Sequence, residues 1–145
     1  MSEPAADKAR AIVKSLTEKY PLQLTGWHTK RRCHSIHDNN QAMHKIDPQM
    51  LWMNPVDAAA RNLQDGDLAE VFNDRGRIRM PVRVTDRIMP GVTAISQGAW
   101  YRPDENGTDT AGSINVLTSL HPTPYARGNG QHTNLVEVTR EESRK

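Results

Sequence analysis

The alternation of residues 77–85 is the feature that most restricts the fold of this chain. Its arginines lie on one face of an extended segment, and the other face is apolar, formed by Ile78, Met80, Val82 and Val84. A period of two indicates a strand with one buried face. Residues 68–72 also have strand composition, and the Asn-Asp-Arg-Gly between the two stretches is a hairpin signal. The sequence therefore predicts a half-buried hairpin.

Further elements follow from the same kind of pattern. Additional strands are expected at residues 22–27, 50–55, 92–96 and 135–139, and residues 115–118 are another apolar stretch. Asn54 is a suitable N-cap and Pro55 suits the first helical position, so the strand at 50–55 should run into a short helix. Residues 5–19 have helical composition, and Pro21 ends that helix.

Many short strands with one short helix among them predict a mainly β, closed barrel. A chain of 145 residues fits one domain with a real core. We expect a linker or N-terminal helix over residues 1–20, the barrel over 21–140 and a charged tail over 141–145. Two irregular segments, 102–113 and 121–131, are longer than simple connections require, and such loops are usually functional or disordered.

Composition excludes several classes of protein. No run of about 18 apolar residues is present, so we expect no direct membrane insertion. The first ten residues contain no apolar signal-peptide core. A single cysteine, Cys33, excludes an internal disulfide and a cysteine-rich metal site. The net charge of +2 is too small to indicate nucleic acid by itself.

Residues 28–34, His-Thr-Lys-Arg-Arg-Cys-His, form a local basic stretch without an acid. Charge alone leaves two interpretations open. The stretch is either a solvated loop or a contact for a phosphate-bearing partner.

Catalytic patterns are weak in this sequence. The six histidines include no H-x-x-x-H pair on an expected helix and no HExxH motif, so we predict no metal ligand. Cys33 lies between Arg32 and His34, but nothing can be assigned to orient a base. Gly112-Ser113 is too common a pair to indicate self-cleavage. We therefore assign no catalytic residue.

Polar loop residues are abundant instead, and each group lies beside the end of an expected strand. They are His34, Ser35, Ser113, Asn115, Thr118, Gln131, His132, Thr133 and Asn134. Loop groups held by a rigid scaffold commonly bind polar ligands. The pattern favours a domain that binds a large polar ligand over a self-sufficient enzyme.

Several stretches resemble one known family. They are YPLQLTGWHTKRRCHS, the block LWMNPVDAAARNLQDGDLAEVFNDRGRIRMPVRVTDRIMPGVTAISQGAWY, GSINVLT and GNGQHTNLVEV. Their order resembles the C-terminal domain of the dimethyl sulfoxide reductase family of molybdopterin oxidoreductases, above all the anaerobic dimethyl sulfoxide reductases. The resemblance covers residues 21–138. It implies a six-stranded double-psi β-barrel of the molybdopterin dinucleotide-binding type, related to the aspartate decarboxylase barrel.

The resemblance also implies a cofactor, a molybdenum (rarely tungsten) ion held by two molybdopterin guanine dinucleotides. Lys30 and Arg32 would then contact phosphate oxygens, and His34 and Ser35 would lie on the cofactor. Asn115 would contact a pterin or guanine edge. The remaining side of the cofactor site would be formed by Gln131, His132, Thr133 and Asn134. Trp100 and Tyr101 would lie near the cofactor-facing surface or pack in the core.

Family members are several times longer than this chain, and their metal ligand, iron–sulfur cysteines and substrate funnel belong to other domains. The resemblance thus implies partners: the remaining domains of the catalytic subunit, an iron–sulfur electron-transfer subunit and a membrane anchor. We expect this chain to be an excised domain rather than a separate subunit and to be inactive alone, and we expect no nucleic acid partner. The cellular compartment is left open. The alternative function is a barrel adaptor that binds protein or nucleic acid without a cofactor.

Overall fold

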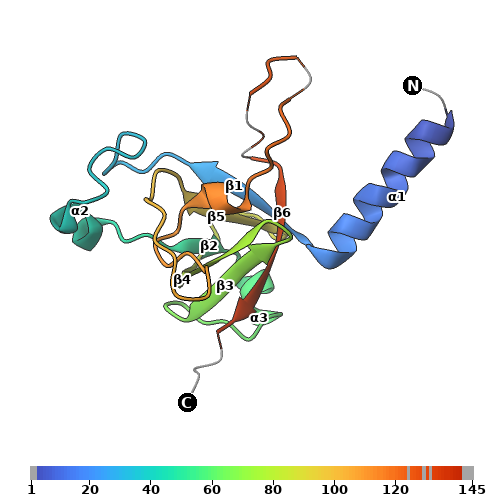
Figure 1. Ribbon diagram of the computed structural model, residues 1–145. Helices are drawn as coiled ribbons and strands as arrows, with labels where there is room; N and C mark the ends of the chain where they lie inside the picture. The colour runs from blue at the N-terminus through green and yellow to red at the C-terminus, as the bar shows by residue number, and fades with distance from the viewer. Residues whose placement is uncertain (1–2, 124, 129, 131, 142–145) are drawn as a thin grey trace.

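The computed structural model describes residues 3–123, 125–128, 130 and 132–141, and its centre is a closed barrel of six strands (Figure 1). The strands follow one another around the barrel in the order β1-β5-β2-β4-β3-β6. Their bounds are β1 Leu22–Trp27, β2 Leu51–Met53, β3 Leu68–Asn73, β4 Gly76–Val84, β5 Val92–Ser96 and β6 Asn134–Arg140. The prediction of a mainly β, six-stranded barrel is confirmed.

The predicted hairpin is the antiparallel pair β3 and β4, in which Asn73 pairs with Gly76 across the turn. Two strand pairs are parallel, β1 with β5 and β2 with β4. Parallel pairing needs a crossover connection. Neither parallel pair is consecutive in the chain, so whole strands form these crossovers: β2, β3 and β4 lie between β1 and β5, and β3 lies between β2 and β4.

The barrel interior is filled by alternate residues of each strand. On β4 the buried residues are Ile78, Met80 and Val82, whereas Arg77 and Arg83 are exposed, as the alternation predicts. The interior residues of β1 and β2 are Leu22, Leu24, Leu51 and Met53, each at most 2% exposed. This single apolar cluster holds the wall together and leaves the strand ends free to carry loops.

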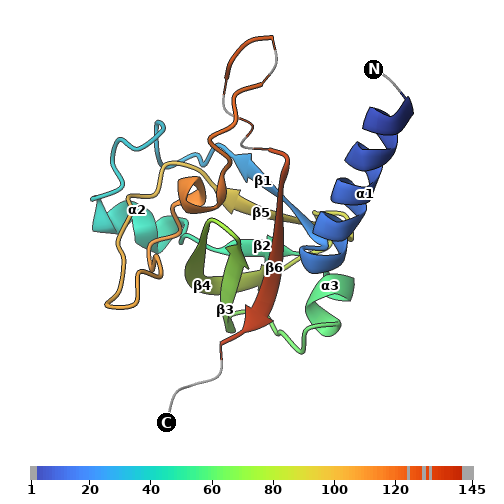
Figure 2. The same ribbon diagram turned by 45° about the vertical axis from the view of Figure 1, so that its right-hand side comes forward.

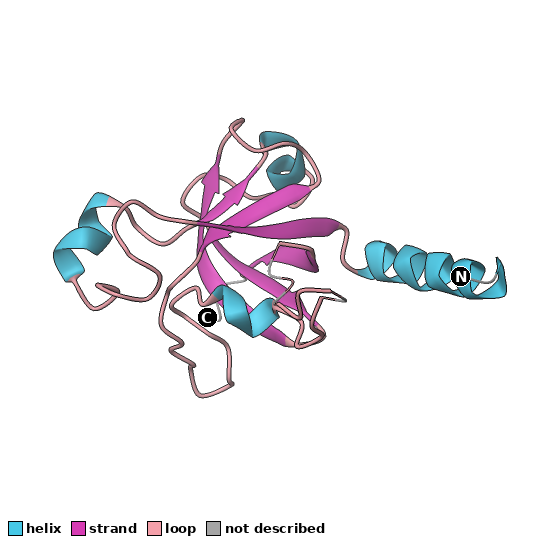
Figure 3. Cartoon of the chain, turned by 90° about the horizontal axis from the view of Figure 1, so that it is seen from above, coloured by secondary structure: helices cyan, strands magenta, loops and turns pink. Residues whose placement is uncertain are grey.

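The described residues form four helical segments outside the barrel wall: α1 (Glu3–Lys19), α2 (Gln41–Ile46), α3 (Pro55–Ala59) and the 3₁₀ helix η1 (Ile114–Leu117). The N-terminal helix and α3 are confirmed, and the Asn54 side chain caps α3 by accepting the Val56 N–H at 2.9 Å. α1 extends away from the barrel (Figure 3). α2 was not predicted, because it is short and buries no residue.

Replacing Leu51, which is fully buried on β2, by alanine should lower the free energy of unfolding by roughly 2–5 kcal/mol, because the cavity is closed in by neighbouring strands. The matched control is Val56→Ala on α3, where the side chain is 64% exposed and the change should stay within about 0.5 kcal/mol. Urea unfolding of both variants measures the difference. Equal losses would contradict the assignment of Leu51 to the barrel interior.

Candidate functional site

Three long segments meet at one end of the barrel. Because β1 and β5 are parallel, Trp27 and Ser96 lie side by side where both strands end. β6 begins next to them, with Asn134 paired to Leu24. The segments that follow β1 and precede β6 both project from this part of the barrel (Figures 1 and 2). The barrel topology thus gathers loops that are far apart in sequence.

Gly26, near the end of β1, is the point at which two of these segments meet. A Cβ at this position would lie 3.2 Å from Cδ1 of Ile114 and 3.7 Å from Cε1 of His132. His132 accepts the Gly26 N–H through Nδ1 at 3.3 Å, and its carbonyl accepts from the Gln23 amide at 3.1 Å. The start of η1 and the residues before β6 therefore close over the same glycine.

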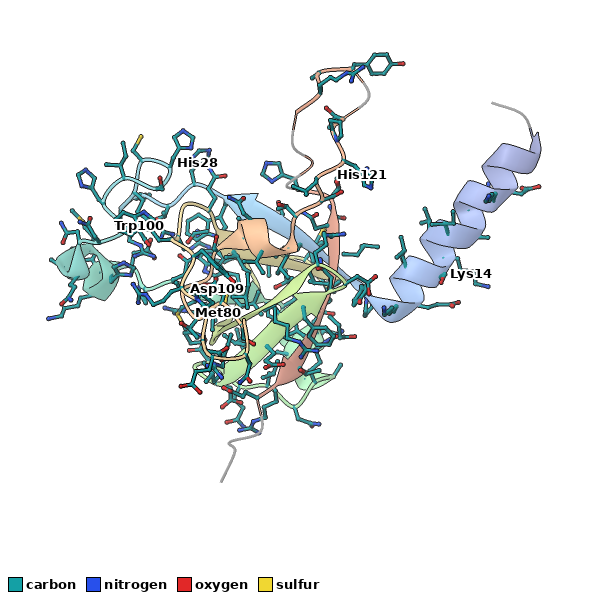
Figure 4. All side chains as sticks on the ribbon, viewed as in Figure 1. Lys14, His28, Met80, Trp100, Asp109 and His121 are labelled. Atoms are coloured by element: carbon teal, nitrogen blue, oxygen red, sulfur yellow. The ribbon has the colours of Figure 1, made fainter. Side chains whose placement is uncertain are left out.

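The loop after β1 is locked to the loop after β5 by Gly98. This glycine has φ +94°, and a Cβ built on it would lie 1.7 Å from the carbonyl oxygen of His34. The Trp100 indole N–H donates to the Ser35 carbonyl at 2.9 Å, and the His28 and His34 rings lie 5.4 Å apart. Figure 4 shows His28 and Trp100 on this lobe of the molecule. No side chain fits between the two loops at Gly98.

Arg32 and Asp38 form a buried ion pair beneath this lobe, with side chains 0% and 4% exposed. The Asp38 carboxylate also accepts the Trp100 N–H at 2.8 Å, and Arg32 donates to the Ser96 hydroxyl at 3.1 Å. Burial opposes ionisation of Asp38, but the Trp100 N–H and the Arg32 guanidinium outweigh it and lower the pKa of this carboxyl below its ordinary value. The pair ties loop 28–40 to the end of β5.

Gln49 extends the pair into a network that reaches a third loop. Its Oε1 accepts from Arg31 at 3.1 Å and from Arg32 at 2.7 Å. Its Nε2 donates to the carbonyls of Ser96 at 2.7 Å and Gly112 at 3.0 Å. Every hydrogen-bonding atom of this amide is used, so one side chain connects loop 28–40, β5 and the segment before η1.

The segment 102–113 has no apolar anchor, and the structure shows that Asp109 holds it instead. This carboxylate is fully buried. It accepts the backbone N–H groups of Arg102 at 2.8 Å, Gly112 at 2.9 Å and Ser113 at 2.6 Å. The loop is therefore shaped by a polar anchor, which fixes the approach of the chain to η1.

The segment between η1 and β6 is held to the β3–β4 hairpin by a second group of polar side chains. The Asn134 Oδ1 accepts from the Ser119 N–H at 3.2 Å and from Arg75 at 3.4 Å. The Leu117 carbonyl accepts from Asn73 at 3.0 Å and from Arg75 at 2.9 Å. Sequence reasoning missed Asn73, Arg75 and Gln49, since their partners lie 42 or more residues away in most of these contacts.

The basic stretch 28–34 presents much less charge than its sequence suggests. Arg31 and Arg32 are 7% and 6% exposed, and both are held by the Gln49 network. Burial, and then the proximity of Arg32, lower the pKa of Arg31 from its ordinary value. Lys30 is exposed and has no ionic partner in the described part of the chain. Of the three cations, Lys30 is the one that faces solvent.

Comparison with known proteins decides what this arrangement belongs to. Residues 22–135 match the family described as "Molydopterin dinucleotide binding domain". The match covers most of the chain and the whole barrel except the end of β6.

The chain belongs to the molybdopterin dinucleotide-binding domain family.

Three curated relatives of this domain carry the names of dimethyl sulfoxide reductases and of a trimethylamine-N-oxide reductase. The chain is 53% identical to dimethyl sulfoxide reductase DmsA of Haemophilus influenzae over 86% of its length and 49% identical to the Escherichia coli K12 protein of that name over 85%. It is 37% identical to trimethylamine-N-oxide reductase 1 of Escherichia coli over 84% of its length. The chain spans only 16%, 15% and 15% of these three proteins.

A solved structure has the same fold at low sequence identity. It is acetylene hydratase from Pelobacter acetylenicus, with a TM-score of 0.73 and 15% identity, matched over 87% of this chain and 19% of that one. At this identity the likeness supports the fold of the molybdopterin dinucleotide-binding domain and nothing more specific.

The structure places most of the predicted binding residues of this domain at the surface. Those exposed are Lys30, His34, Ser35, Asn115, His132 and Thr133. Arg32 is buried and held by Asp38, Gln49 and Ser96, and Gln131 lies outside the described residues. Trp100 and Tyr101 are 48% and 57% exposed, so they are not core residues.

Among the described residues, no group of three or more His, Cys, Asp or Glu side chains is placed to hold a metal ion. No helix within the described ranges has the length and hydrophobicity needed to cross a membrane.

Gly98→Ala should displace the loop around His34, because the new methyl group would overlap the His34 carbonyl. Gly91→Ala is the matched control, since Gly91 has a similar φ of +81° but open space around its Cβ position. Both variants carry the left-handed backbone strain, roughly 1–2 kcal/mol. Only Gly98→Ala should also shift the amide resonances of residues 33–36. If the two variants change these resonances equally, the close approach is not what holds the loop.

The Arg32–Asp38 pair should make stability depend on acid pH. Because the pKa of Asp38 is depressed in the folded state, its contribution is fully present above the ordinary carboxyl value of about 4 and is lost as pH falls through the folded value. Asp38→Asn should cost roughly 3–5 kcal/mol near pH 7, since it leaves Arg32 buried without its partner. The difference in the free energy of unfolding between Asp38→Asn and the unsubstituted protein, measured by urea unfolding, should become smaller as the pH falls. A constant difference down to pH 2 would contradict the assignment.

Proposed function

We propose that this chain is the C-terminal cofactor-binding domain of an oxidoreductase that holds molybdenum through two molybdopterin guanine dinucleotides and reduces a small S- or N-oxide. The single observation that carries the proposal is the family match over residues 22–135. The names of the relatives support the class of substrate, because those at about half identity are dimethyl sulfoxide reductases and a more distant one is a trimethylamine-N-oxide reductase.

The exposed residues of the site fit a dinucleotide in their chemistry. They offer imidazole, hydroxyl and amide groups, which both donate and accept hydrogen bonds, and one ammonium group, Lys30. None of the predicted contact residues is a carboxylate, which would repel a pyrophosphate. Gly26 supports this site from below, because the absence of a Cβ lets Ile114 and His132 pack directly against β1.

Each predicted residue has a role under this proposal. Lys30 neutralises a phosphate oxygen, and His34 and Ser35 bind the cofactor from the Gly98-locked loop. Asn115 hydrogen-bonds a pterin or guanine edge, and His132 and Thr133 close the site from the β6 side. Gln131 is assigned to the same wall by its position in the sequence. When bound, the metal supplies the oxygen-transfer and redox chemistry, and this chain holds and orients the organic part of the cofactor.

Arg32 takes a different part within the proposed site. Its guanidinium is occupied by Asp38, Gln49 and Ser96, so in this arrangement it shapes the loop that carries Lys30, His34 and Ser35. A direct contact of Arg32 with phosphate would require it to leave a buried carboxylate. We therefore propose that Arg32 supports binding mainly by positioning its neighbours.

The complete enzyme is proposed to include further domains of the catalytic subunit, an iron–sulfur electron-transfer subunit and a membrane anchor. The chain spans only 16% and 15% of its two dimethyl sulfoxide reductase relatives, which leaves room for the metal ligand and the substrate funnel outside it. On this view the chain does not turn over substrate alone.

The alternative, an adaptor barrel without a cofactor, has no support from the relatives. Its physical basis was the basic stretch 28–34, and two of the three cations there are buried in the Gln49 network. A salt-dependent contact with nucleic acid needs exposed cations along a surface. The binding-domain proposal is therefore the one retained.

Guanosine diphosphate should shift the amide resonances of three segments of this chain, those around His34, Asn115 and His132, because it reproduces the nucleotide half of the proposed cofactor. His132→Ala should weaken this binding roughly five- to tenfold, the effect of about one hydrogen bond. His121→Ala, a histidine of the same projecting segment without an assigned role, is the control and should bind as before (Figure 4). Absence of shifts in all three segments would refute a nucleotide site on this chain.

A further inference from the structure

A hollow lies on the outer wall of the barrel, between β1, β2 and α2. Its volume is about 380 Å³. Trp27 and Trp52 line it, and their rings lie 5.0 Å apart. Both point outward, because the alternate residues Leu24, Leu51 and Met53 fill the barrel interior. We call this hollow the Trp27–Trp52 pocket.

The pocket carries an excess of positive charge. Lys30 and Arg87 line it, and the Arg87 guanidinium lies 5.2 Å from the centre of the Trp52 ring. Neither cation has a carboxylate partner within the described residues. The one acid in the lining, Asp47, is already engaged by Thr29 at 2.8 Å and by Arg31 at 3.5 Å. A ligand of this pocket should therefore carry negative charge.

One buried donor of the pocket also lacks an acceptor. The Trp27 indole nitrogen, Nε1, is buried and has no hydrogen-bond partner among the described residues. Arg31 Nε, by contrast, faces the Asp47 carboxylate at 3.5 Å. Buried donors in native proteins are nearly always satisfied, so the unpaired indole N–H points to an acceptor supplied from outside.

The rim of the pocket is apolar and uncovered. Ile46, at the end of α2, is 77% exposed, and Met43 is half-buried. α2 buries none of its residues against the barrel. It forms an outlying part of the fold, well separated from α1 (Figures 1 and 3). A helix with no buried face gains its stability from packing against something else.

We propose that the Trp27–Trp52 pocket is a docking surface for a segment of another domain of the same enzyme, in which a bulky apolar side chain is flanked by a carboxylate. The apolar side chain covers Ile46 and the two indole rings, and the carboxylate pairs with Arg87. Charge complementarity selects this occupant, and the relatives provide its source, because about five-sixths of their length lies outside the matched part. The inference rests on the proposed function, which makes this chain one domain of a larger enzyme.

The test is cysteine labelling in the complete enzyme and in this chain alone, both carrying Cys33→Ser to remove the exposed native thiol. A cysteine is introduced by Ile46→Cys, and Val56→Cys on α3 serves as an exposed reference. Maleimide should label position 46 at least tenfold more slowly in the complete enzyme than in this chain. Adding Arg87→Glu should restore most of the labelling, whereas Arg10→Glu, an exposed arginine on α1, should not.

Equal labelling of position 46 in the two proteins would overturn the docking surface. So would protection that appears in this chain alone as its concentration rises, because the occupant would then be a second copy. Molybdopterin content, measured on the same enzyme samples, separates this inference from the function. Enzyme that lacks the cofactor but protects position 46 refutes the proposed function alone, and loaded enzyme that leaves position 46 exposed refutes the docking surface alone.

Discussion

The buried interaction among Arg32, Asp38 and Gln49 is the constraint on which the arrangement of the loops at one end of this barrel depends. Burying two charges is costly unless their hydrogen bonds are complete, and here the carboxylate is met by Arg32 and by a backbone N–H of Trp100. Gln49 then uses both ends of its amide to hold β5 and Gly112 in the same assembly. Because the connection is polar and directional, it fixes the loops in orientation as well as in position, which an apolar contact would not do.

The barrel wall and the loops are stabilised by different forces. The wall depends on an apolar cluster that includes Leu24, Leu51 and Val136. The loops depend on carboxylates and amides such as Asp109, whose buried oxygens are satisfied by neighbouring backbone N–H groups. Loops built this way can expose polar side chains without an apolar anchor beneath each one. That arrangement suits a surface that must offer many hydrogen bonds to a large polar ligand.

The sequence was sufficient for the parts of the fold that repeat with a fixed period. The strands, the hairpin at Asp74 and the Asn54 cap follow from local alternation and capping preferences, and the structure confirms them. It was insufficient for α2, which buries no face, and for Gln49, whose partners are distant in sequence. The site residues were predicted because polar side chains gather beside the expected strand ends and the stretches resemble a known family, and they stay a prediction. The burial of Arg31 and Arg32 was not foreseen, since charge pattern alone cannot show which cation has a buried acceptor.

The burial of Arg31 and Arg32 changes which ligands the surface of loop 28–40 can recognise. A loop with three exposed cations would bind anions of many kinds, mainly by charge, and its affinity would fall steeply with salt. With Arg31 and Arg32 turned inward, Lys30 is the exposed cation of this stretch, and its neighbours His34 and Ser35 offer imidazole and hydroxyl groups. Recognition must then come from the fit of hydrogen-bonding groups to a ligand of defined shape, with charge as a smaller contribution. The same two arginines therefore give the loop its form and remove the surface charge that would have made it unselective.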